Sequence, residues 1–214
     1  MGDRHKNDKK IGKTFNRFFN KEPKDAILEN FDASSQLHVE HILAIKPNSV
    51  LDVGMGAGGI LLALQKQGVP NLSGVDLSPN AVQLTKKRFE KFGTLENTSL
   101  IEGNFLDMEY NNFDAISFHH ILNLYPDYKS LITKAIELNP KVMAISMPQN
   151  LFKNRIKACF LSILVKILSF DFPFRLIHNH RPEDVVQLFT ATGYTQSFKQ
   201  LFKKNLTMIF IKSD

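Results

Sequence analysis

Short apolar runs alternate along the chain with longer segments in which apolar residues recur every three or four positions. A short apolar run is typical of a strand buried on both faces, and the longer spacing is typical of an amphipathic helix. The predicted strands are 49–53, 72–76, 98–102, 113–118 and 141–146. The predicted helices between them are 58–68, 79–92 and 127–138. This order predicts an α/β fold, with a doubly wound and mostly parallel sheet covered by helices on both faces.

The two ends of the chain depart from this alternation. Apolar positions within 24–45 predict one or two helices before the first strand. Near the C-terminus, Pro182 and the acids after it favour a helix start, and Gly193 ends that helix. Two strand-like runs follow around Lys203-Lys204-Asn205. The sheet is therefore predicted to have seven strands and to finish in a C-terminal antiparallel hairpin.

The chain has 214 residues, of which 43% are hydrophobic and 22% are charged. These values are typical of a soluble globular domain with a sizeable core, and a second full domain does not fit. Cys159 is the only cysteine, which excludes a disulfide within the chain and a cysteine-based zinc site. The first residues lack the apolar core of a secretory signal, so we expect a cytoplasmic protein.

The formal net charge of +6 is concentrated at the N-terminus. Residues 1–24 hold eight Lys and Arg against three acids, whereas the remaining body is almost neutral. We therefore divide the chain into a basic N-terminal arm, 1–24, and one domain, 25–214. A neutral body argues against a broad nucleic-acid surface, although a basic arm can add non-specific affinity for phosphate. The simplest interpretation of the arm is a solvated tail or helix face.

The first predicted strand runs directly into a glycine-rich turn, Gly54-Met55-Gly56-Ala57-Gly58-Gly59. Glycines allow a sharp turn and a close approach of the backbone to a ligand, and the helix that follows offers free N–H groups. Taken as GxGxxG, the turn matches enzymes that bind dinucleotides. Taken as GxGxG, with Gly54, Gly56 and Gly58, it matches enzymes that bind S-adenosylmethionine. The loop alone leaves both cofactors open.

Two acids help to distinguish these cofactors. Asp52 lies two residues before Gly54, so both share one side of the strand near the crevice at its C-terminal end. A carboxylate there would repel a pyrophosphate but attract a ligand that carries an amine and a sulfonium. Asp76 ends the next strand, at the distance expected for a carboxylate that accepts both ribose hydroxyls. Leu77 could then pack against the adenine.

The segment 51–58, followed by Gly74-Val75-Asp76-Leu77-Ser78-Pro79, resembles motifs I and II of class I S-adenosylmethionine-dependent methyltransferases. The resemblance runs from about Val50 to the C-terminus, because Gly103-Asn104-Phe105 is similar to the family's adenine-contacting loop. The family often has an acid where this chain has Asn104. A nicotinamide or flavin domain and a purely structural turn remain the alternatives. The resemblance implies a Rossmann-like fold, S-adenosylmethionine as cofactor, and the cofactor-binding residues Asp52, Gly54, Met55, Gly56, Gly58, Asp76, Leu77, Asn104 and Phe105.

An insertion at about 148–180 separates the fifth strand from the last helix. Its segment 156–170 is mostly apolar, with polar residues on one narrow helical face, and is too short to span a bilayer. It could be a core or dimer-forming helix, a lid over an apolar acceptor, or a helix at a membrane surface. Because the family commonly inserts substrate-recognition elements here, we expect a hydrophobic or aromatic acceptor.

Methyl transfer from a sulfonium depends mainly on positioning, and a base is needed only when the acceptor atom carries a proton. His119 and His120 follow the fourth strand, whose end should border the methyl group, so they are the candidate catalytic residues. They could instead complete the pocket by packing. Tyr125 and His178 are candidate substrate or lid residues, and packing at the helix start is the alternative for His178 and His180. No metal site is expected, because no carboxylate completes a ligand spacing with the histidines.

The sequence has no Asn/Asp-Pro-Pro-aromatic motif after the fourth strand and no cysteine suited to cytosine methylation, which disfavours DNA bases as acceptors. Tyr125-Pro126-Asp127 and Ile145-Ser146-Met147-Pro148 are loosely similar to magnesium-protoporphyrin O-methyltransferases. We expect a methyltransferase acting on oxygen or nitrogen of a small, partly apolar molecule. It would be a monomer or homodimer, without a transmembrane segment or a nucleic-acid partner. Peripheral membrane contact, an RNA-directed methyltransferase and a non-catalytic cofactor-binding subunit stay open.

Overall fold

The computed structural model describes residues 2–20, 32–148, 178, 180–202 and 205–213. Its helices are α1 (Gly2–Phe18), α2 (Ala33–Leu43), α3 (Gly59–Lys66), α4 (Pro79–Phe92), α5 (Tyr128–Glu137) and α7 (Pro182–Ala191), with short 3-10 helices η2 (Phe105–Asp107) and η3 (Leu122–Leu124). Its strands are β1 (Ser49–Val53), β2 (Asn71–Asp76), β3 (Thr98–Glu102), β4 (Ala115–His119), β5 (Val142–Pro148), β6 (Tyr194–Phe202) and β7 (Asn205–Lys212).

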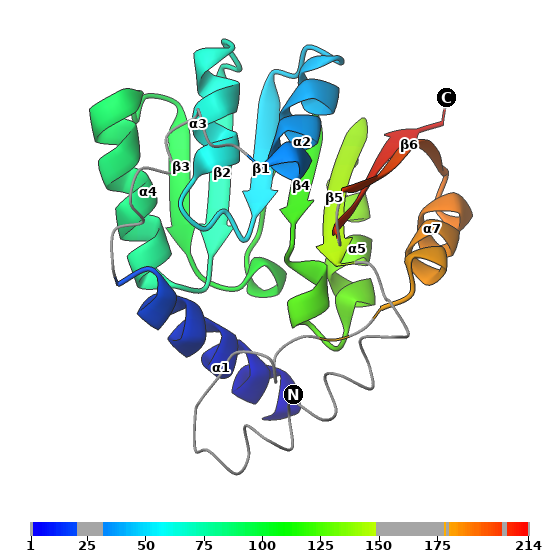
Figure 1. Cartoon of the computed structure of the whole chain (residues 1–214), viewed down its shortest axis with the longest axis horizontal. Coiled ribbons are helices and arrows are strands. Elements are labelled where there is room, and N and C mark those ends of the chain that lie inside the picture. Colours follow the sequence, from blue (N-terminus) through cyan, green and yellow to red (C-terminus); the bar gives the residue numbers. More distant parts are fainter. Residues whose placement is uncertain (1, 21–31, 149–177, 179, 203–204, 214) are drawn as a thin grey trace.

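The strands form one seven-stranded sheet in the order β3-β2-β1-β4-β5-β7-β6. Strands β1 to β5 run parallel, whereas β7 is antiparallel to both β5 and β6. The predicted Rossmann-like sheet with a C-terminal antiparallel hairpin is therefore confirmed (Figure 1). The strand order reverses between β1 and β4, and open α/β sheets bind ligands outside such a switch point.

Alternate strand residues face two hydrophobic clusters, one on each side of the sheet. Leu51 and Ile116 join side chains of α5 and α7 in one cluster. Val50 and Ala115 join side chains of α2, α3 and α4 in the other. Since consecutive residues of a strand point to opposite faces, one apolar run supplies both clusters. Burial of both sets fixes the strand register and hence the positions of the strand ends.

The predicted bounds of β1, β3 and α4 are confirmed, and those of α3, β2, β4, α5 and β5 differ by one or two residues. Strand β4 begins at Ala115 instead of 113, because the Asp114 carboxylate turns back toward the start of β1. It accepts hydrogen bonds from the Asn48 and Ser49 backbone N–H groups, at 2.7 and 3.3 Å. Helix α2 accounts for part of the helical region predicted within 24–45.

The predicted insertion, 148–180, lies almost entirely outside the described residues. Its interpretation as a lid, a core helix or a membrane-surface helix therefore stays a prediction. Within the part of the chain that the structure describes, no helix combines the length and the apolar character needed to cross a membrane.

The basic N-terminal arm contains α1, which lies beyond the C-terminal ends of the parallel strands (Figure 1). Ile11 is 2% exposed and joins the cluster that contains α5 and α7. Gly12 lies so close to Leu77 that a Cβ there would meet the Leu77 backbone oxygen at 3.1 Å. Lys9 and Lys10, by contrast, are exposed. Helix α1 therefore buries one side against the domain and presents basic residues to solvent.

Candidate functional site

Polar side chains gather where β1, β2 and β4 end. Asp52 in β1 is the register partner of Ser117 in β4. Asp76 ends β2, which pairs with β1 on the other side, and His119 ends β4. Parallel strands end at the same edge of a sheet, and this part of the edge lies at the switch in strand order. These side chains therefore occupy the place where open α/β sheets bind ligands.

The loop after β1 is built from three glycines in the left-handed region. Gly54, Gly56 and Gly58 have φ values of +74°, +53° and +70°, whereas Gly59 is the first residue of α3. The Gly54 N–H group donates to the Val75 oxygen at 2.8 Å, which ties the loop to β2. The glycines that need this backbone geometry are thus those of the GxGxG pattern.

Asp76 fastens the same loop to the end of β2. Its Oδ2 atom accepts a hydrogen bond from the Gly56 N–H group at 2.9 Å, and Oδ1 accepts one from the Ser78 N–H group at 2.8 Å. Burial raises the pKa of Asp76 above its ordinary value, and these two hydrogen bonds oppose the shift. A carboxylate has about four lone-pair sites, so Asp76 keeps acceptor capacity for a diol.

Asp52 is a buried carboxylate whose charge is poorly compensated. The residue is 2% exposed, and its Oδ1 atom has no hydrogen-bond partner among the described residues. Burial raises the pKa of Asp52 to about 6, against the effects of a hydrogen bond from Ser117 and of nearby His119. A buried and unpaired carboxylate oxygen is costly unless a cation pairs with it. Asp52 therefore fits a cationic ligand.

Two residues predicted to contact the cofactor turn their side chains into the core. Met55 is 5% exposed, and its sulfur would lie 2.3 Å from a Cβ built at Gly74. Phe105 is 2% exposed and packs edge-on against Phe118. Contacts of Met55 and Phe105 with a cofactor stay a prediction, and with these side-chain positions they would involve backbone atoms.

Asn104 is engaged by contacts within the protein. Its Nδ2 group donates to Asp8 Oδ2 at 2.8 Å, and its Oδ1 atom accepts from the Leu106 N–H group at 2.9 Å. Asp8 comes from α1 and is 8% exposed. The loop after β3 therefore has a carboxylate beside it, supplied by the N-terminal helix. No sequence pattern pointed to Asp8, because it and Asn104 are 96 positions apart.

Helix α1 also reaches the end of β2 and the glycine loop. Asn16 Oδ1 accepts from the Asn80 N–H group at 3.1 Å, and Asn80 Nδ2 donates to the Asn16 backbone oxygen at 2.8 Å. Leu77, the residue predicted to pack on adenine, packs against the cluster that includes α1. The Phe19 ring, just after α1, would lie 3.2 Å from a Cβ at Gly56. The arm is thus part of the wall of the candidate site.

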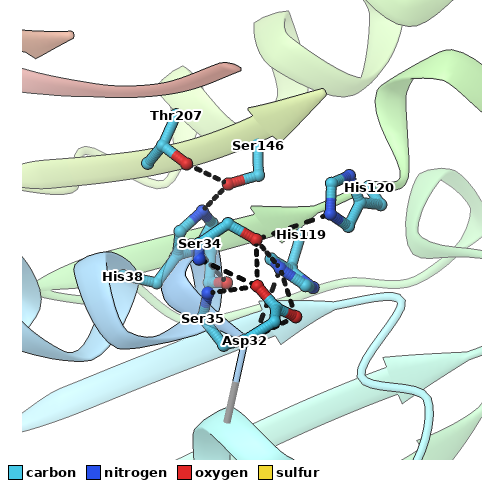
Figure 2. A network of polar contacts seen from close by, with 9 residues as sticks. Asp32, Ser34, Ser35, His38, His119, His120, Ser146 and Thr207 are labelled. Atoms are coloured by element: carbon cyan, nitrogen blue, oxygen red, sulfur yellow. Dashed lines mark hydrogen bonds and ion pairs between the residues drawn. The ribbon is translucent and has the colours of Figure 1, made fainter. Parts of the chain in front are cut away.

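A second polar cluster joins the N-terminus of α2 to the end of β4 (Figure 2). Asp32 caps α2 by accepting hydrogen bonds from the Ser34 and Ser35 N–H groups at 2.8 and 3.1 Å. His119 Nε2 lies 2.8 Å from Ser34 Oγ and 3.8 Å from Asp32 Oδ2. The Ser34 hydroxyl also bonds to Asp32 Oδ1 and lies 3.5 Å from His120 Nε2. The structure thus brings both candidate catalytic histidines to one serine.

The charges in this cluster follow from the same contacts. The interaction with His119 holds the pKa of Asp32 well below its usual range, against the opposing effect of burial. Burial lowers the pKa of His120 to about 4, so His120 is neutral at pH 7. The cluster therefore combines an ionised carboxylate with an imidazole that is neutral at pH 7. In the described part of the chain, no group of three or more His, Cys, Asp or Glu side chains is arranged so that it could hold a metal ion.

Sequence reasoning missed Asp32 and Ser34 as site residues. Asp32-Ala33-Ser34-Ser35 is a typical pattern for a helix N-cap, and it would have predicted the start of α2. The pattern does not tell which strand end the helix start will meet, since that depends on how α2 packs on the sheet.

The candidate substrate residues after β4 and before α7 pack against one another. Tyr125 is 6% exposed and belongs to the hydrophobic core, so packing accounts for its position and a substrate contact stays a prediction. His180 Nε2 lies 2.7 Å from the Tyr125 backbone oxygen, and its ring contacts Tyr128. The His178 N–H group donates to the Asn123 oxygen at 2.6 Å. Packing thus accounts for His180, whereas a substrate contact by His178 stays a prediction.

Residues 46–163, more than half of the chain, match the family model for a methyltransferase domain. The chain therefore belongs to the methyltransferase domain family, the class I fold whose enzymes use S-adenosylmethionine. The predicted family and cofactor are thus confirmed.

Known proteins similar to this chain differ in the acceptors that their names give. Human EEF1A lysine methyltransferase 2 is 39% identical over 82 residues, which cover 33% of this chain and only 34% of the human protein. Ubiquinone biosynthesis O-methyltransferase from Coxiella burnetii is 27% identical over 164 residues, 73% of this chain and 67% of that protein. Magnesium protoporphyrin IX methyltransferase from Synechocystis, solved with bound S-adenosylmethionine, superposes with a TM-score of 0.70 at 14% identity over 97% of each chain. This last likeness concerns the fold alone.

The buried charge of Asp52 should destabilise the fold at neutral pH. Its pKa is about 6 in the folded protein against an ordinary value of 3.8, so the ionised form costs stability above that range. We predict that Asp52→Asn raises the melting temperature at pH 7 by roughly 5 °C or more. The gain should shrink as the pH falls below about 6, because Asp52 of the wild type then takes up a proton.

Thermal denaturation at several pH values measures this effect. Asp114→Asn is the matched control, because the contact with Lys141 lowers the pKa of Asp114 and its ionised form is stabilising. This control should lower the melting temperature at pH 7. A lower melting temperature for Asp52→Asn would contradict the account of Asp52.

Proposed function

We propose that this chain transfers the methyl group of S-adenosylmethionine to an oxygen or nitrogen atom of a small, partly apolar acceptor. The observation that carries the proposal is the pair of carboxylates, Asp52 and Asp76, on adjacent strands beside a GxGxG loop. Membership of the methyltransferase domain family supports the class of reaction. The histidine cluster at the end of β4 supports proton removal next to that cofactor site.

When bound, S-adenosylmethionine supplies a methyl group attached to a positively charged sulfur. Asp52 would pair with the cationic part of the cofactor through its unpartnered Oδ1 atom. Asp76 would accept hydrogen bonds from the ribose hydroxyls, and the pair of Asp8 and Asn104 would lie at the adenine. Charge pairing is strong in a crevice from which water is partly excluded, and α1 helps to exclude it.

His119 is the proposed general base for an acceptor atom that carries a proton. The ionised Asp32 can only accept a hydrogen bond, so the Ser34 hydroxyl donates to it and offers a lone pair to His119 Nε2–H. This assignment leaves His119 Nδ1 without a proton and able to take one from the acceptor. Asp32 then stabilises the imidazolium that forms.

This arrangement favours one kind of acceptor. A phenol, alcohol or amine must lose a proton during methylation and gains from a base, whereas a carboxylate acceptor does not need one. The match to an O-methyltransferase of ubiquinone biosynthesis covers 73% of the chain and supports a small acceptor. The match to a protein lysine methyltransferase covers 33% and supports that class less.

Loss of the Asp76 carboxylate should weaken cofactor binding. We predict that Asp76→Ala raises the dissociation constant of S-adenosylmethionine by about 100-fold or more, because two charge-assisted hydrogen bonds are lost. Glu102→Ala is the matched control, since Glu102 is the register partner of Asp76 on β3 and is exposed. Equilibrium binding measures both variants. Equal affinities of Asp76→Ala and the wild type would rule out this assignment of the cofactor site.

Loss of the His119 imidazole should slow methyl transfer without abolishing cofactor binding. Transfer from radiolabelled S-adenosylmethionine to a panel of phenols, alcohols and amines gives the readout. We predict that His119→Ala lowers kcat on the methylated acceptor by about 10²–10⁴-fold and that added imidazole restores part of it. Ser34→Ala should cause a smaller loss. An undiminished kcat in His119→Ala would contradict a role as base.

A further inference from the structure

A chain of buried polar side chains leads away from Asp52, and the proposed reaction does not use it. His38 of α2 lies at its centre, with Nδ1 3.0 Å from Ser117 Oγ and Nε2 2.8 Å from Ser146 Oγ. Ser146 Oγ lies 2.8 Å from Thr207 Oγ1, as Figure 2 shows. Ser117 is the register partner of Asp52 and hydrogen-bonds to it. Each of these five residues is at most 2% exposed.

The chemistry of these groups permits only one direction for the hydrogen bonds when Asp52 is ionised. A carboxylate only accepts, so the Ser117 hydroxyl must donate to it. Ser117 then has only lone pairs left for His38, so His38 Nδ1 carries the proton. Burial holds the pKa of His38 well below its ordinary value, so the imidazole is neutral and its Nε2 accepts from Ser146. Ser146 in turn accepts from Thr207.

We propose that His38 is a positioning residue of the cofactor site, which keeps Asp52 ionised by holding the Ser117 hydroxyl as a donor to it. This inference rests on the proposed role of Asp52 in binding S-adenosylmethionine. A protonated Asp52 could still accept from Ser117 through its carbonyl oxygen, but that hydrogen bond would be weaker than the one to the ionised carboxylate. Because the Ser117 oxygen accepts a hydrogen bond from His38, the Ser117 hydroxyl hydrogen stays directed at Asp52. The network therefore favours the ionised form of Asp52.

Few other groups influence the charge of Asp52. Asp76 on β2 disfavours the ionised form, and His119 on β4 favours it. On α2 the polar group that reaches this network is His38, whereas His41 packs against Phe198 of β6. The hydrogen bond from Ser117 is the largest effect that opposes burial. The network through His38 thus acts on the strongest stabilising contact of the Asp52 charge.

His38→Phe keeps a ring of similar size but removes the N–H donor. Binding of the cationic cofactor requires ionised Asp52. The affinity for S-adenosylmethionine is therefore highest above the pKa of Asp52 and falls as the pH drops through that pKa. In His38→Phe this fall should move to higher pH by about one unit, which means about tenfold weaker binding below the transition. Well above the transition, the affinity should equal that of the wild type. A merely structural role would weaken binding at every pH.

A second readout needs no cofactor. Isotope-edited infrared spectra of the protein without S-adenosylmethionine follow the protonation of Asp52 as the pH is changed. The carboxyl band of Asp52 is identified as the one that is missing from the spectrum of Asp52→Asn. The pH midpoint of Asp52 protonation should be higher in His38→Phe and in Ser117→Ala than in the wild type. His38→Asn retains an N–H donor, so its midpoint should lie between those of His38→Phe and the wild type. His41→Ala is the control on the same helix and should not move it. The same titrations in a His119→Asn background remove the effect of His119 on Asp52.

The outcomes separate this inference from the proposed function. Unchanged midpoints in both His38→Phe and Ser117→Ala overturn the role of His38. If the wild type does not bind S-adenosylmethionine, the proposed function fails, and the infrared titration still decides whether His38 controls Asp52. If His38→Phe does not fold, Ser117→Ala and Thr207→Val each remove a single hydroxyl group. The first should raise the midpoint more than the second, and no rise in either overturns the inference.

Discussion

The whole site depends on one unfavourable interaction, the burial of the Asp52 carboxylate at the end of β1. Strand β1 lies between β2 and β4, so neighbours on both sides shield its end from water. The hydrogen bond from Ser117 offsets only part of the cost, and Oδ1 has no partner among the described residues. A carboxylate with all its hydrogen-bond partners in the protein would attract a cationic ligand less strongly. The buried charge of Asp52 thus lowers the stability of the fold and provides a binding site for a cation.

Helices α1 and α2, which precede β1 in the sequence, complete this site at the ends of different strands. Helix α1 brings Asp8 to the loop after β3 and covers the end of β2, and α2 brings Asp32 to the end of β4 (Figures 1 and 2). The described basic side chains of α1 are exposed, so their charge is separate from the contacts of α1 with the site; they are Lys6, Lys9, Lys10, Lys13 and Arg17. An RNA-directed activity would concern only that exposed side.

The sequence sufficed for the parts of the fold whose signals are local. Helix α4 begins where Ser78 caps it and Pro79 follows, and the glycine loop follows an apolar run. Asp8 and His38 could not be found in this way, because their partners Asn104 and Ser117 are 96 and 79 positions distant. Met55 belongs to the cofactor motif, yet its side chain fills space beside Gly74. The direction in which such a side chain points depends on the packing of neighbouring strands, which no local sequence pattern specifies.

Calorimetric titration of the protein with S-adenosylmethionine and with NAD, above and below pH 6, tests the central claim most directly. The charge on Asp52 predicts that S-adenosylmethionine binds at both pH values, more weakly below pH 6, and that binding there releases a proton to the buffer. NAD should not bind, because its pyrophosphate meets the same carboxylate. Binding of NAD alone, or binding of S-adenosylmethionine with no dependence on pH, would contradict the account.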